Sequence, residues 1–238
     1  MAASVVLVHG LRTSRTMWRH QVERLESVGH AVYPVDLPGH GGRMGERFTL
    51  DAAVDTIGSA VTRAAEESGA PAFLAGFSLG AYLALEYAGR GDAPIRGVLA
   101  ASCGTVPYRW ILAPYRAGAN VIARLPDRGR SMNEFFVRRF VPAPGADDVL
   151  AGGAPLDVMD DVLRELRRLT PLESVRRIDV PIWFVNGRFD HFRLQERAFL
   201  RAAPNGRLVH VPNANHMVSV TNPDAFTGIL LDALTETA

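Results

Sequence analysis

Short, continuous runs of apolar residues recur along the chain and predict six β-strands. The predicted strands cover residues 5–8, 31–35, 71–75, 95–102, 180–185 and 207–211. Most of these runs show no alternation of apolar and polar positions, which is typical of strands buried on both faces of a parallel sheet. We therefore expect a mostly parallel sheet that is covered on both sides.

Between these runs, apolar residues recur at helical spacing. Trp18, Val22 and Leu25, for example, stand at i, i+4 and i+7. The predicted helices cover about residues 18–25, 50–61, 79–87, 194–203 and 226–234. Strands that alternate with helices predict an α/β fold with right-handed crossovers, which bring the carboxyl ends of all strands to one edge of the sheet. Ligands bind at that edge in such folds.

The alternation of strands and helices lapses between residues 105 and 170. This segment has a middle rich in proline and glycine (residues 141–155) and helical patches on either side, such as Met159, Leu163 and Leu166 at helical spacing. We predict a helical lid inserted after the fourth strand. The chain would then consist of a core, residues 1–104 and 171–238, and a lid, residues 105–170.

Composition and charge narrow the class of protein. The chain of 238 residues is 47% hydrophobic and 21% charged, with a net charge of +1, so neither a nucleic acid nor a membrane is expected as a partner. A lone cysteine, Cys103, excludes an intramolecular disulfide and fits a reducing compartment. With no recognisable signal peptide and no apolar run of about 20 residues, we expect a cytoplasmic protein.

A glycine-containing turn separates the third predicted strand from the helix that follows it. Its sequence, Gly76-Phe77-Ser78-Leu79-Gly80, is a Gly-x-Ser-x-Gly motif in the strand–turn–helix context of a nucleophile elbow. The glycines let strand and helix approach closely, so that the Ser78 hydroxyl projects above the sheet edge. We interpret Ser78 as a catalytic nucleophile; the alternative is an ordinary turn in which Ser78 caps the helix.

Two further polar residues follow strands of the predicted sheet. Asp190 comes after the fifth strand and His216 after the sixth. The chain order Ser78, Asp190, His216 matches that of a Ser-His-Asp triad built on a nucleophile elbow. We expect His216 to accept the proton of Ser78, and Asp190 to orient the imidazole and stabilise its charged form.

With these motifs in place, essentially the whole chain resembles the α/β-hydrolase fold family. The resemblance includes the His9-Gly10-Leu11 loop after the first strand and residues 222–226 after the predicted base. It implies an oxyanion hole formed by the backbone N–H groups of Leu11 and Leu79. Phe77 departs from the histidine that many members carry there and is similar to some esterases and cofactor-free haloperoxidases.

Five residues are candidates for substrate binding: Arg12, Trp110, Phe135, Phe136 and His191. Arg12 adjoins the oxyanion loop and could bind a substrate carboxylate, or it could simply face solvent. His191 follows the predicted acid and either lines the pocket or lies on the surface. The aromatic residues of the lid suggest a mainly hydrophobic substrate, unless they only pack the lid onto the core.

These observations predict a cofactor-independent serine hydrolase that cleaves a carboxylic ester, a thioester or a lactone. The sequence lacks metal-ligand spacing and nucleotide-binding motifs, so we expect neither a metal nor a cofactor. Residues 105–140 hold seven arginines against two acidic residues. This excess is explained by a helix face exposed to solvent, or alternatively by the binding of an acidic substrate or an acyl carrier as a partner. The alternatives are a lyase, a cofactor-free haloperoxidase or oxygenase, and a hydrolase-like ligand receptor. The sequence does not define an oligomeric state.

Overall fold

The six predicted strands form one parallel sheet. The computed structural model describes residues 2–238, and its strands are hydrogen-bonded in the order β2-β1-β3-β4-β5-β6, every neighbouring pair being parallel. Their bounds are β1 (Ser4–Val8), β2 (Ala31–Val35), β3 (Ala72–Phe77), β4 (Ile95–Ala101), β5 (Ile182–Gly187) and β6 (Gly206–Val211). The prediction of a mostly parallel sheet is confirmed, and no strand end differs from its predicted position by more than two residues.

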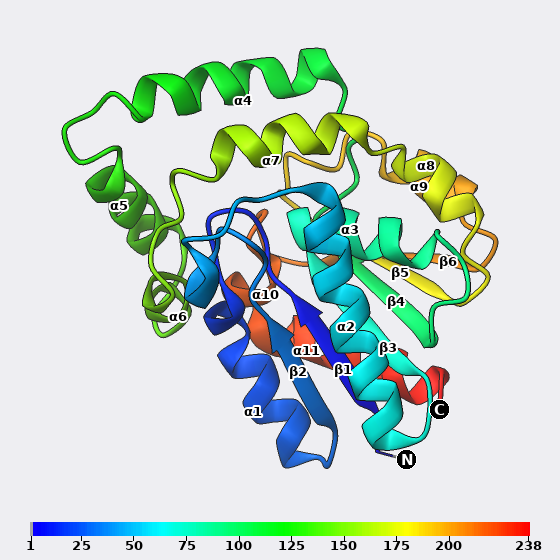
Figure 1. Cartoon of the computed structure of the whole chain (residues 1–238). Coiled ribbons are helices and arrows are strands. Elements are labelled where there is room, and N and C mark those ends of the chain that lie inside the picture. The colour runs from blue at the N-terminus through cyan, green and yellow to red at the C-terminus, as the bar shows by residue number, and fades with distance from the viewer. Residues whose placement is uncertain (1) are drawn as a thin grey trace.

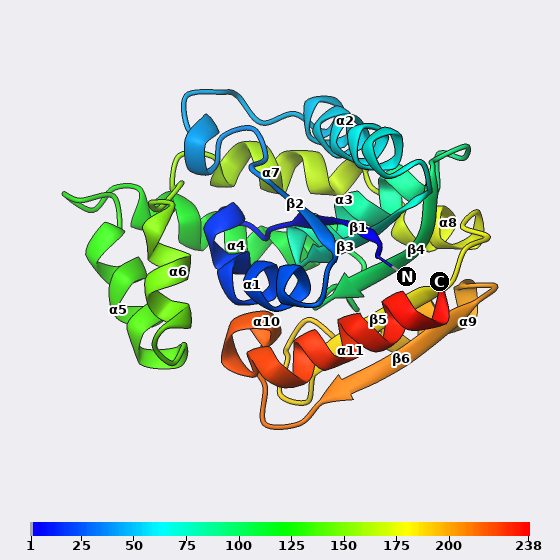
Figure 2. The same ribbon diagram turned by 90° about the horizontal axis from the view of Figure 1, so that it is seen from below.

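Helices cover both faces of this sheet, as the two orthogonal views show (Figures 1 and 2). One face carries α2 (Leu50–Ser68), α3 (Leu79–Ala88), α8 (Pro171–Arg176) and α9 (Glu196–Ala202); the other carries α1 (Arg19–Ser27), α10 (Val218–Thr221) and α11 (Pro223–Glu236). Successive side chains of a strand point to opposite faces. Val6 and Leu74 accordingly belong to one hydrophobic cluster, and their neighbours Val5 and Phe73 to the other.

Helix α2 shows how local sequence sets the limits of an element. The Thr49 side chain accepts a hydrogen bond from the Ala52 N–H and so caps the first turn. An apolar stripe that includes Ile57 and Val61 faces the sheet. The helix continues beyond the predicted residue 61 and ends at Gly69, whose φ of +68° is a left-handed conformation that glycine adopts without a side-chain clash.

Four helices and a short 3₁₀ turn are inserted between β4 and α8. We call this insertion, residues 109–168, the cap. It contains α4 (Arg109–Ile122), α5 (Arg130–Phe140), α6 (Gly145–Ala151), α7 (Met159–Glu165) and the turn Leu166–Arg168. Helices α4 and α7 lie side by side above the carboxyl ends of the strands (Figure 1).

The middle of the cap is more ordered than its proline and glycine content predicts. Helix α6 lies inside the segment 141–155, where no helix was expected, and it packs against the body of the molecule. The Arg19 Nε donates a 2.6 Å hydrogen bond to Asp148 Oδ1, and the Thr16 hydroxyl donates one of 2.6 Å to the Asp148 carbonyl. This end of the cap is therefore fixed to the region around α1.

Within residues 2–238, no helix combines the length and apolar character that a membrane crossing requires.

Candidate active site

Ser78 occupies the sharp turn between β3 and α3. Its backbone angles, φ +51° and ψ −114°, are ones that few residues other than glycine adopt. The flanking glycines are required by space: a Cβ on Gly76 would lie 2.4 Å from the carbonyl oxygen of Gly80, and a Cβ on Gly80 would lie 2.3 Å from that of Val8. The Ser78 N–H donates a 2.8 Å hydrogen bond to Ala101 O, which ties the turn to the neighbouring strand β4.

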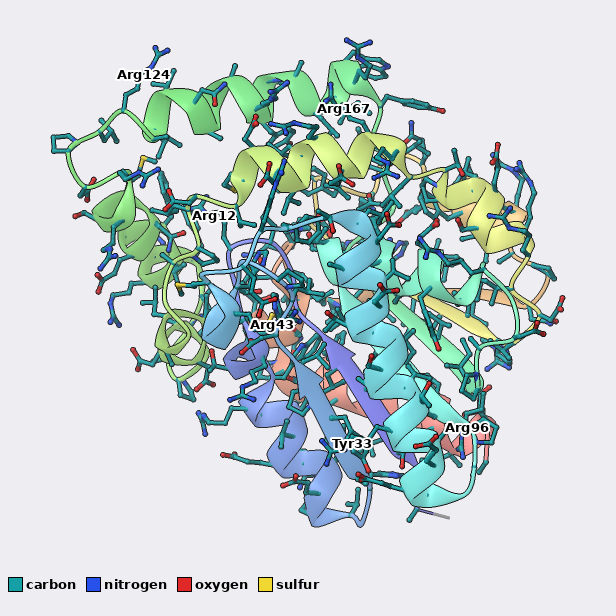
Figure 3. All side chains as sticks on the ribbon, viewed as in Figure 1. Arg12, Tyr33, Arg43, Arg96, Arg124 and Arg167 are labelled. Atoms are coloured by element: carbon teal, nitrogen blue, oxygen red, sulfur yellow. The ribbon has the colours of Figure 1, made fainter. Side chains whose placement is uncertain are left out.

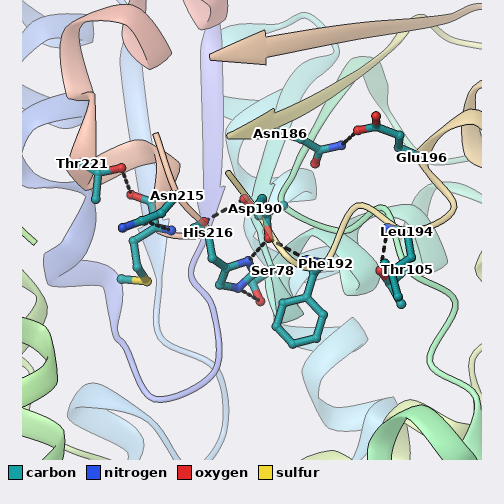
Figure 4. Close-up of polar contacts among 12 residues, drawn as sticks. Ser78, Thr105, Asn186, Asp190, Phe192, Leu194, Glu196, Asn215, His216 and Thr221 are labelled. Carbon is teal, nitrogen blue, oxygen red and sulfur yellow. Dashed lines mark hydrogen bonds and ion pairs between the residues drawn. The ribbon is translucent and has the colours of Figure 1, made fainter. Parts of the chain in front are cut away.

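The structure brings Ser78, His216 and Asp190 into one hydrogen-bonded series (Figure 4). His216 Nε2 lies 3.0 Å from Ser78 Oγ, and His216 Nδ1 lies 3.0 Å from Asp190 Oδ1. The three residues follow β3, β6 and β5 respectively. Parallel strands thus place at one edge three side chains that are far apart in the sequence.

The environment of Asp190 keeps its carboxylate ionised. Burial alone would raise the pKa of Asp190, but the hydrogen bond and charge of His216 and the hydrogen bond from the Phe192 N–H outweigh it, so its pKa lies below the usual range. An ionised carboxylate can only accept a hydrogen bond, so His216 Nδ1 carries the proton and donates to Asp190 Oδ1. The unprotonated Nε2 is then left facing the Ser78 hydroxyl, the tautomer that a general base needs.

Two backbone N–H groups beside Ser78 are available to an anionic oxygen. The N–H groups of Leu11 and Leu79 have no hydrogen-bond acceptor among residues 2–238, and both residues line the cavity that contains Ser78. Leu79 is the first residue of α3, so its N–H lies at the positive end of the helix dipole. This geometry is compatible with the oxyanion hole that the family resemblance implies.

His9 holds the loop that carries Leu11. Its Nδ1 donates to Gly10 O at 2.8 Å, and its Nε2 accepts a 3.0 Å hydrogen bond from the Leu37 N–H. Burial, together with the neighbouring His40, lowers the pKa of His9 to about 3, so the ring stays neutral and can both donate and accept. His9 thereby joins the loop after β1 to the loop after β2.

A cavity of about 290 Å³ lies above Ser78 and is enclosed by both the body and the cap. This volume is near the lower end of the range for small-molecule sites. Most of its wall is apolar. The cap contributes Ile111, Leu112, Tyr115, Met159, Leu163 and Leu166; the body contributes Leu11, Arg12, Leu79, Tyr82, Ser102, His191, Phe192 and His216, among others.

Two of the five predicted substrate-binding residues lie on this cavity, and three do not. Arg12 and His191 line it, although a surface position was the alternative for each. Trp110, Phe135 and Phe136 are 71%, 63% and 49% exposed. They lie on the outward faces of α4 and α5 and do not line the cavity, so we no longer place them in the site.

Two residues that sequence reasoning did not single out support the proposed base. Phe192 supplies the N–H that binds Asp190, and its ring centroid lies 4.9 Å from that of His216. Ser102, with φ +56°, donates a 2.8 Å hydrogen bond to the His216 carbonyl. The signals were present in the sequence, since Phe192 follows the predicted acid closely and Ser102 ends a predicted strand.

Within the described residues, no group of three or more histidine, cysteine or acidic side chains is arranged to hold a metal ion.

Comparisons with known proteins agree with the fold described above. A sequence profile described as the alpha/beta hydrolase family matches residues 5–228. Two proteins named "Pimeloyl-[acyl-carrier protein] methyl ester esterase", from Neisseria meningitidis serogroups C and B, are 27% and 29% identical over 245 residues, covering 96% of this chain and 92% and 91% of theirs.

Solved structures share the fold at low sequence identity. A thermophilic esterase from Thermogutta terrifontis has a TM-score of 0.80 at 20% identity, covering 100% of this chain and 91% of its own. The enol-lactonase from Burkholderia xenovorans LB400 has a TM-score of 0.78 at 20% identity, covering 99% and 92%. The parallel sheet, the turn at Ser78 and a profile match over nearly the whole length lead to one conclusion: the chain belongs to the alpha/beta hydrolase family.

Proposed function

We propose that this protein is a cofactor-independent serine hydrolase that cleaves a carboxylic ester of a small, mainly hydrophobic substrate. The proposal rests on the hydrogen-bonded series Asp190, His216 and Ser78, which ends at a cavity where the N–H groups of Leu11 and Leu79 have no acceptor among residues 2–238. A serine hydroxyl becomes a competent nucleophile when an oriented base adjoins it. The names of the relatives, which include esterases, support the same class of reaction.

In the proposed reaction, His216 Nε2 removes the Ser78 proton as Oγ attacks the ester carbonyl. The carbonyl oxygen becomes negatively charged and accepts hydrogen bonds from the two free N–H groups, each worth about 3 kcal/mol in the transition state. His216 then transfers the proton to the departing alcohol, and an acyl-Ser78 ester remains. A water molecule that gives its proton to His216 hydrolyses this ester, releasing the acid and restoring the serine.

The cavity wall supports a small apolar group as part of the substrate. Ile111, Leu112 and Leu163 of the cap face the proposed nucleophile from above, and we propose that the cap acts as a lid over the bound substrate. Thioesters and lactones react through the same tetrahedral intermediate, so they fall within the proposed class.

A carrier-bound acyl ester is a second candidate substrate. Two observations favour it: relatives are named for an acyl-carrier-protein ester, and the outer surface of the cap is basic. Its exposed arginines are Arg109, Arg124, Arg128, Arg130, Arg138, Arg139, Arg164 and Arg168. Arg128, Arg138, Arg164 and Arg168 are paired with carboxylates of the cap. An acidic carrier would be attracted to this surface, and the attraction would weaken as salt is added.

Hydrolysis of p-nitrophenyl esters from C2 to C12 by the wild type and by Ser78→Ala tests the proposed function. Both proteins are also treated with a fluorophosphonate and examined by intact mass. We expect ester turnover and a single covalent adduct, both lost in Ser78→Ala. A folded wild-type protein that gives neither turnover nor adduct would contradict the hydrolase proposal. An adduct without turnover of any ester, thioester or lactone would favour the non-hydrolytic members of the fold.

A further inference from the structure

Arg12 places a positive charge on the wall of the proposed active site. It directly follows Leu11 and lines the same cavity as Ser78 and His216. Figure 3 shows Arg12 between the body of the molecule and the helices of the cap. Among residues 2–238, no carboxylate lies within ion-pair distance of its guanidinium group. The cation therefore has no counter-charge in the part of the chain that the structure describes.

The hydrogen bonds of Arg12 leave part of its guanidinium group unused. Nη2 donates to Oδ1 of Asn133, a neutral and buried side chain on α5. Nε is also shielded from solvent, yet no acceptor within the described chain reaches it. Burial, with no opposing contribution from an acidic group, lowers the pKa of Arg12. A cation partly shielded from water without a counter-charge is unfavourable, and an anion beside it would relieve that cost.

The backbone at Arg12 is also held in an unfavourable conformation. Its φ is +64°, a left-handed value that arginine rarely adopts. The Thr13 hydroxyl and N–H both donate to the Gly10 carbonyl, at 2.8 Å and 3.4 Å, and close the turn that holds this conformation. Such strain in a site-lining residue is typical of positions that contact a ligand. Strained backbone and unpaired charge thus coincide at one residue.

We propose that Arg12, supported by Asn133, is an anion subsite and that the natural substrate is an ester bearing a free carboxylate. This inference rests on the proposed hydrolase function. A planar guanidinium group fits a carboxylate through two parallel hydrogen bonds. Because Arg12 adjoins Leu11, whose N–H is proposed to bind the reacting carbonyl oxygen, the carboxylate stands only a few atoms from the ester carbon. The apolar cavity wall holds the chain between the two groups.

Matched pairs of substrates test this subsite. Each pair consists of a carboxylate-bearing ester and its amide, for example monoethyl adipate and ethyl adipamate, in a series from succinate to suberate. A second series carries the carboxylate on the alcohol side, as in O-acetylated hydroxy acids and their amides. Release of acid is followed by chromatography. We expect the wild type to have a higher kcat/KM for the anionic member of a pair than for the amide. The series in which this difference is larger shows whether Arg12 lies on the acid side or on the alcohol side of the ester.

Substitutions at Arg12 assign the preference to one side chain. Arg12→Gln removes the charge, and Arg12→Lys keeps it but lacks the planar fork. Arg24→Gln, on the exposed surface of α1, is the matched control. We expect Arg12→Gln to lower the anionic-to-neutral ratio of kcat/KM about 10- to 100-fold, mainly through KM. Arg12→Lys should lose less, and Arg24→Gln should keep the wild-type ratio. Labelling by a fluorophosphonate reports whether each variant keeps a folded site.

Binding to Ser78→Ala separates failure of the subsite from failure of the hydrolase proposal. Calorimetry compares monoethyl adipate with ethyl adipamate, and neither measurement needs turnover. Tighter binding of the anion to Ser78→Ala, lost in Ser78→Ala/Arg12→Gln, supports the subsite even if the wild type hydrolyses no ester. The subsite proposal is overturned if the wild type has equal kcat/KM for the two members of each pair. Where there is no turnover, it is overturned if the two members bind Ser78→Ala equally.

Discussion

At the residue scale, the position of one proton on His216 decides whether this ring can act as the base that we propose for Ser78. Asp190 Oδ1 accepts from His216 Nδ1 and from the Phe192 N–H, so the carboxylate fixes both the tautomer and the orientation of the imidazole. The Phe77 and Phe192 rings lie 5.3 Å and 4.9 Å from the His216 ring. Apolar neighbours therefore restrict the imidazole to the orientation that reaches Ser78.

Asp190→Asn should abolish most activity without unfolding the protein. The amide has nearly the same shape, but its NH₂ group would favour a proton on Nε2 of His216, which then cannot accept one from Ser78. We expect kcat to fall about 10³- to 10⁴-fold and fluorophosphonate labelling of Ser78 to slow in parallel. The matched control is Asp224→Asn, whose side chain is 88% exposed, and it should retain wild-type kcat. Wild-type kcat in Asp190→Asn would contradict the proposed role.

At the element scale, the site depends on how closely α3 approaches the sheet. Gly80 lies in the first turn of α3, over the carbonyl oxygens of Val8 and His9 at the end of β1. This approach brings the N–H of Leu79, on the turn after β3, and that of Leu11, on the loop after β1, to the same cavity. Glycine at position 80 is thus required by the packing of one element on another.

Gly80→Ala should destabilise the protein and impair the proposed oxyanion hole. The added methyl group would lie 2.3 Å and 2.5 Å from backbone carbonyl oxygens, so α3 would have to move away from β1. We expect the free energy of unfolding in urea to fall by about 1–3 kcal/mol, with a loss of kcat. Gly228→Ala on α11, where a Cβ meets nothing within 4 Å, should instead add about 0.5–1 kcal/mol. Equal stability changes in the two variants would refute the packing argument.

The two sides of the cap helices should differ in their effect on substrate choice. Leu163 on α7 is buried and lines the cavity, whereas Trp110 on α4 is exposed. Leu163→Phe shortens the cavity, so kcat/KM for the longest ester that the wild type accepts should fall about tenfold or more, while short esters are spared. Trp110→Ala should leave the chain-length profile of the p-nitrophenyl series unchanged. A shift of that profile in Trp110→Ala would restore this residue to the site.

At the scale of the whole molecule, the sequence was sufficient to predict the sheet and the three residues of the hydrogen-bonded series. Buried parallel strands must be apolar throughout, as residues 72–77 and 182–185 are, so they stand out in the sequence. Once parallel topology is inferred, the residues after each strand must meet at one edge. Ser78, Asp190 and His216 were predicted together for this reason, although they are far apart along the chain.

The interior of the cap could not be predicted in the same way. An amphipathic helix has an apolar face, but which side chains reach a cavity depends on where the helix docks. Ile111 lines the cavity and the adjacent Trp110 does not, a difference that the sequence does not encode locally. Helix α6 was missed because its packing against residues 15–19 is a tertiary contact, and Arg12 was uncertain because burial of an arginine depends on the cap above it.

The stability of the whole molecule should fall in mild acid because His9 is buried in its neutral form. The folded protein holds the pKa of His9 at about 3, against about 6.5 for an exposed histidine, and burial also lowers the pKa of His40. Below pH 6.5 the unfolded chain therefore binds protons that the folded chain excludes, and this difference favours unfolding. Stability from this source is complete above pH 6.5 and declines as the pH falls toward 3.

The expected change for His9 is about 1.4 kcal/mol per pH unit, or about 2 kcal/mol between pH 6.5 and pH 5. Urea unfolding at pH 7.5, 6.5, 5.5 and 5.0 measures it, and this range avoids most carboxylate titration. His9→Gln is expected to lower stability at every pH, because the bonds to Gly10 and Leu37 are altered, yet its pH slope should be shallower by about 1.4 kcal/mol per unit than that of the wild type. The values at pH 7.5, where histidine is neutral in both states, give the baseline that separates the lost contacts from the lost titration. Parallel slopes for the two proteins would contradict this argument. They would mean that His9 binds a proton as readily in the folded state as in the unfolded state, although one of its nitrogens must stay unprotonated to accept from the Leu37 N–H.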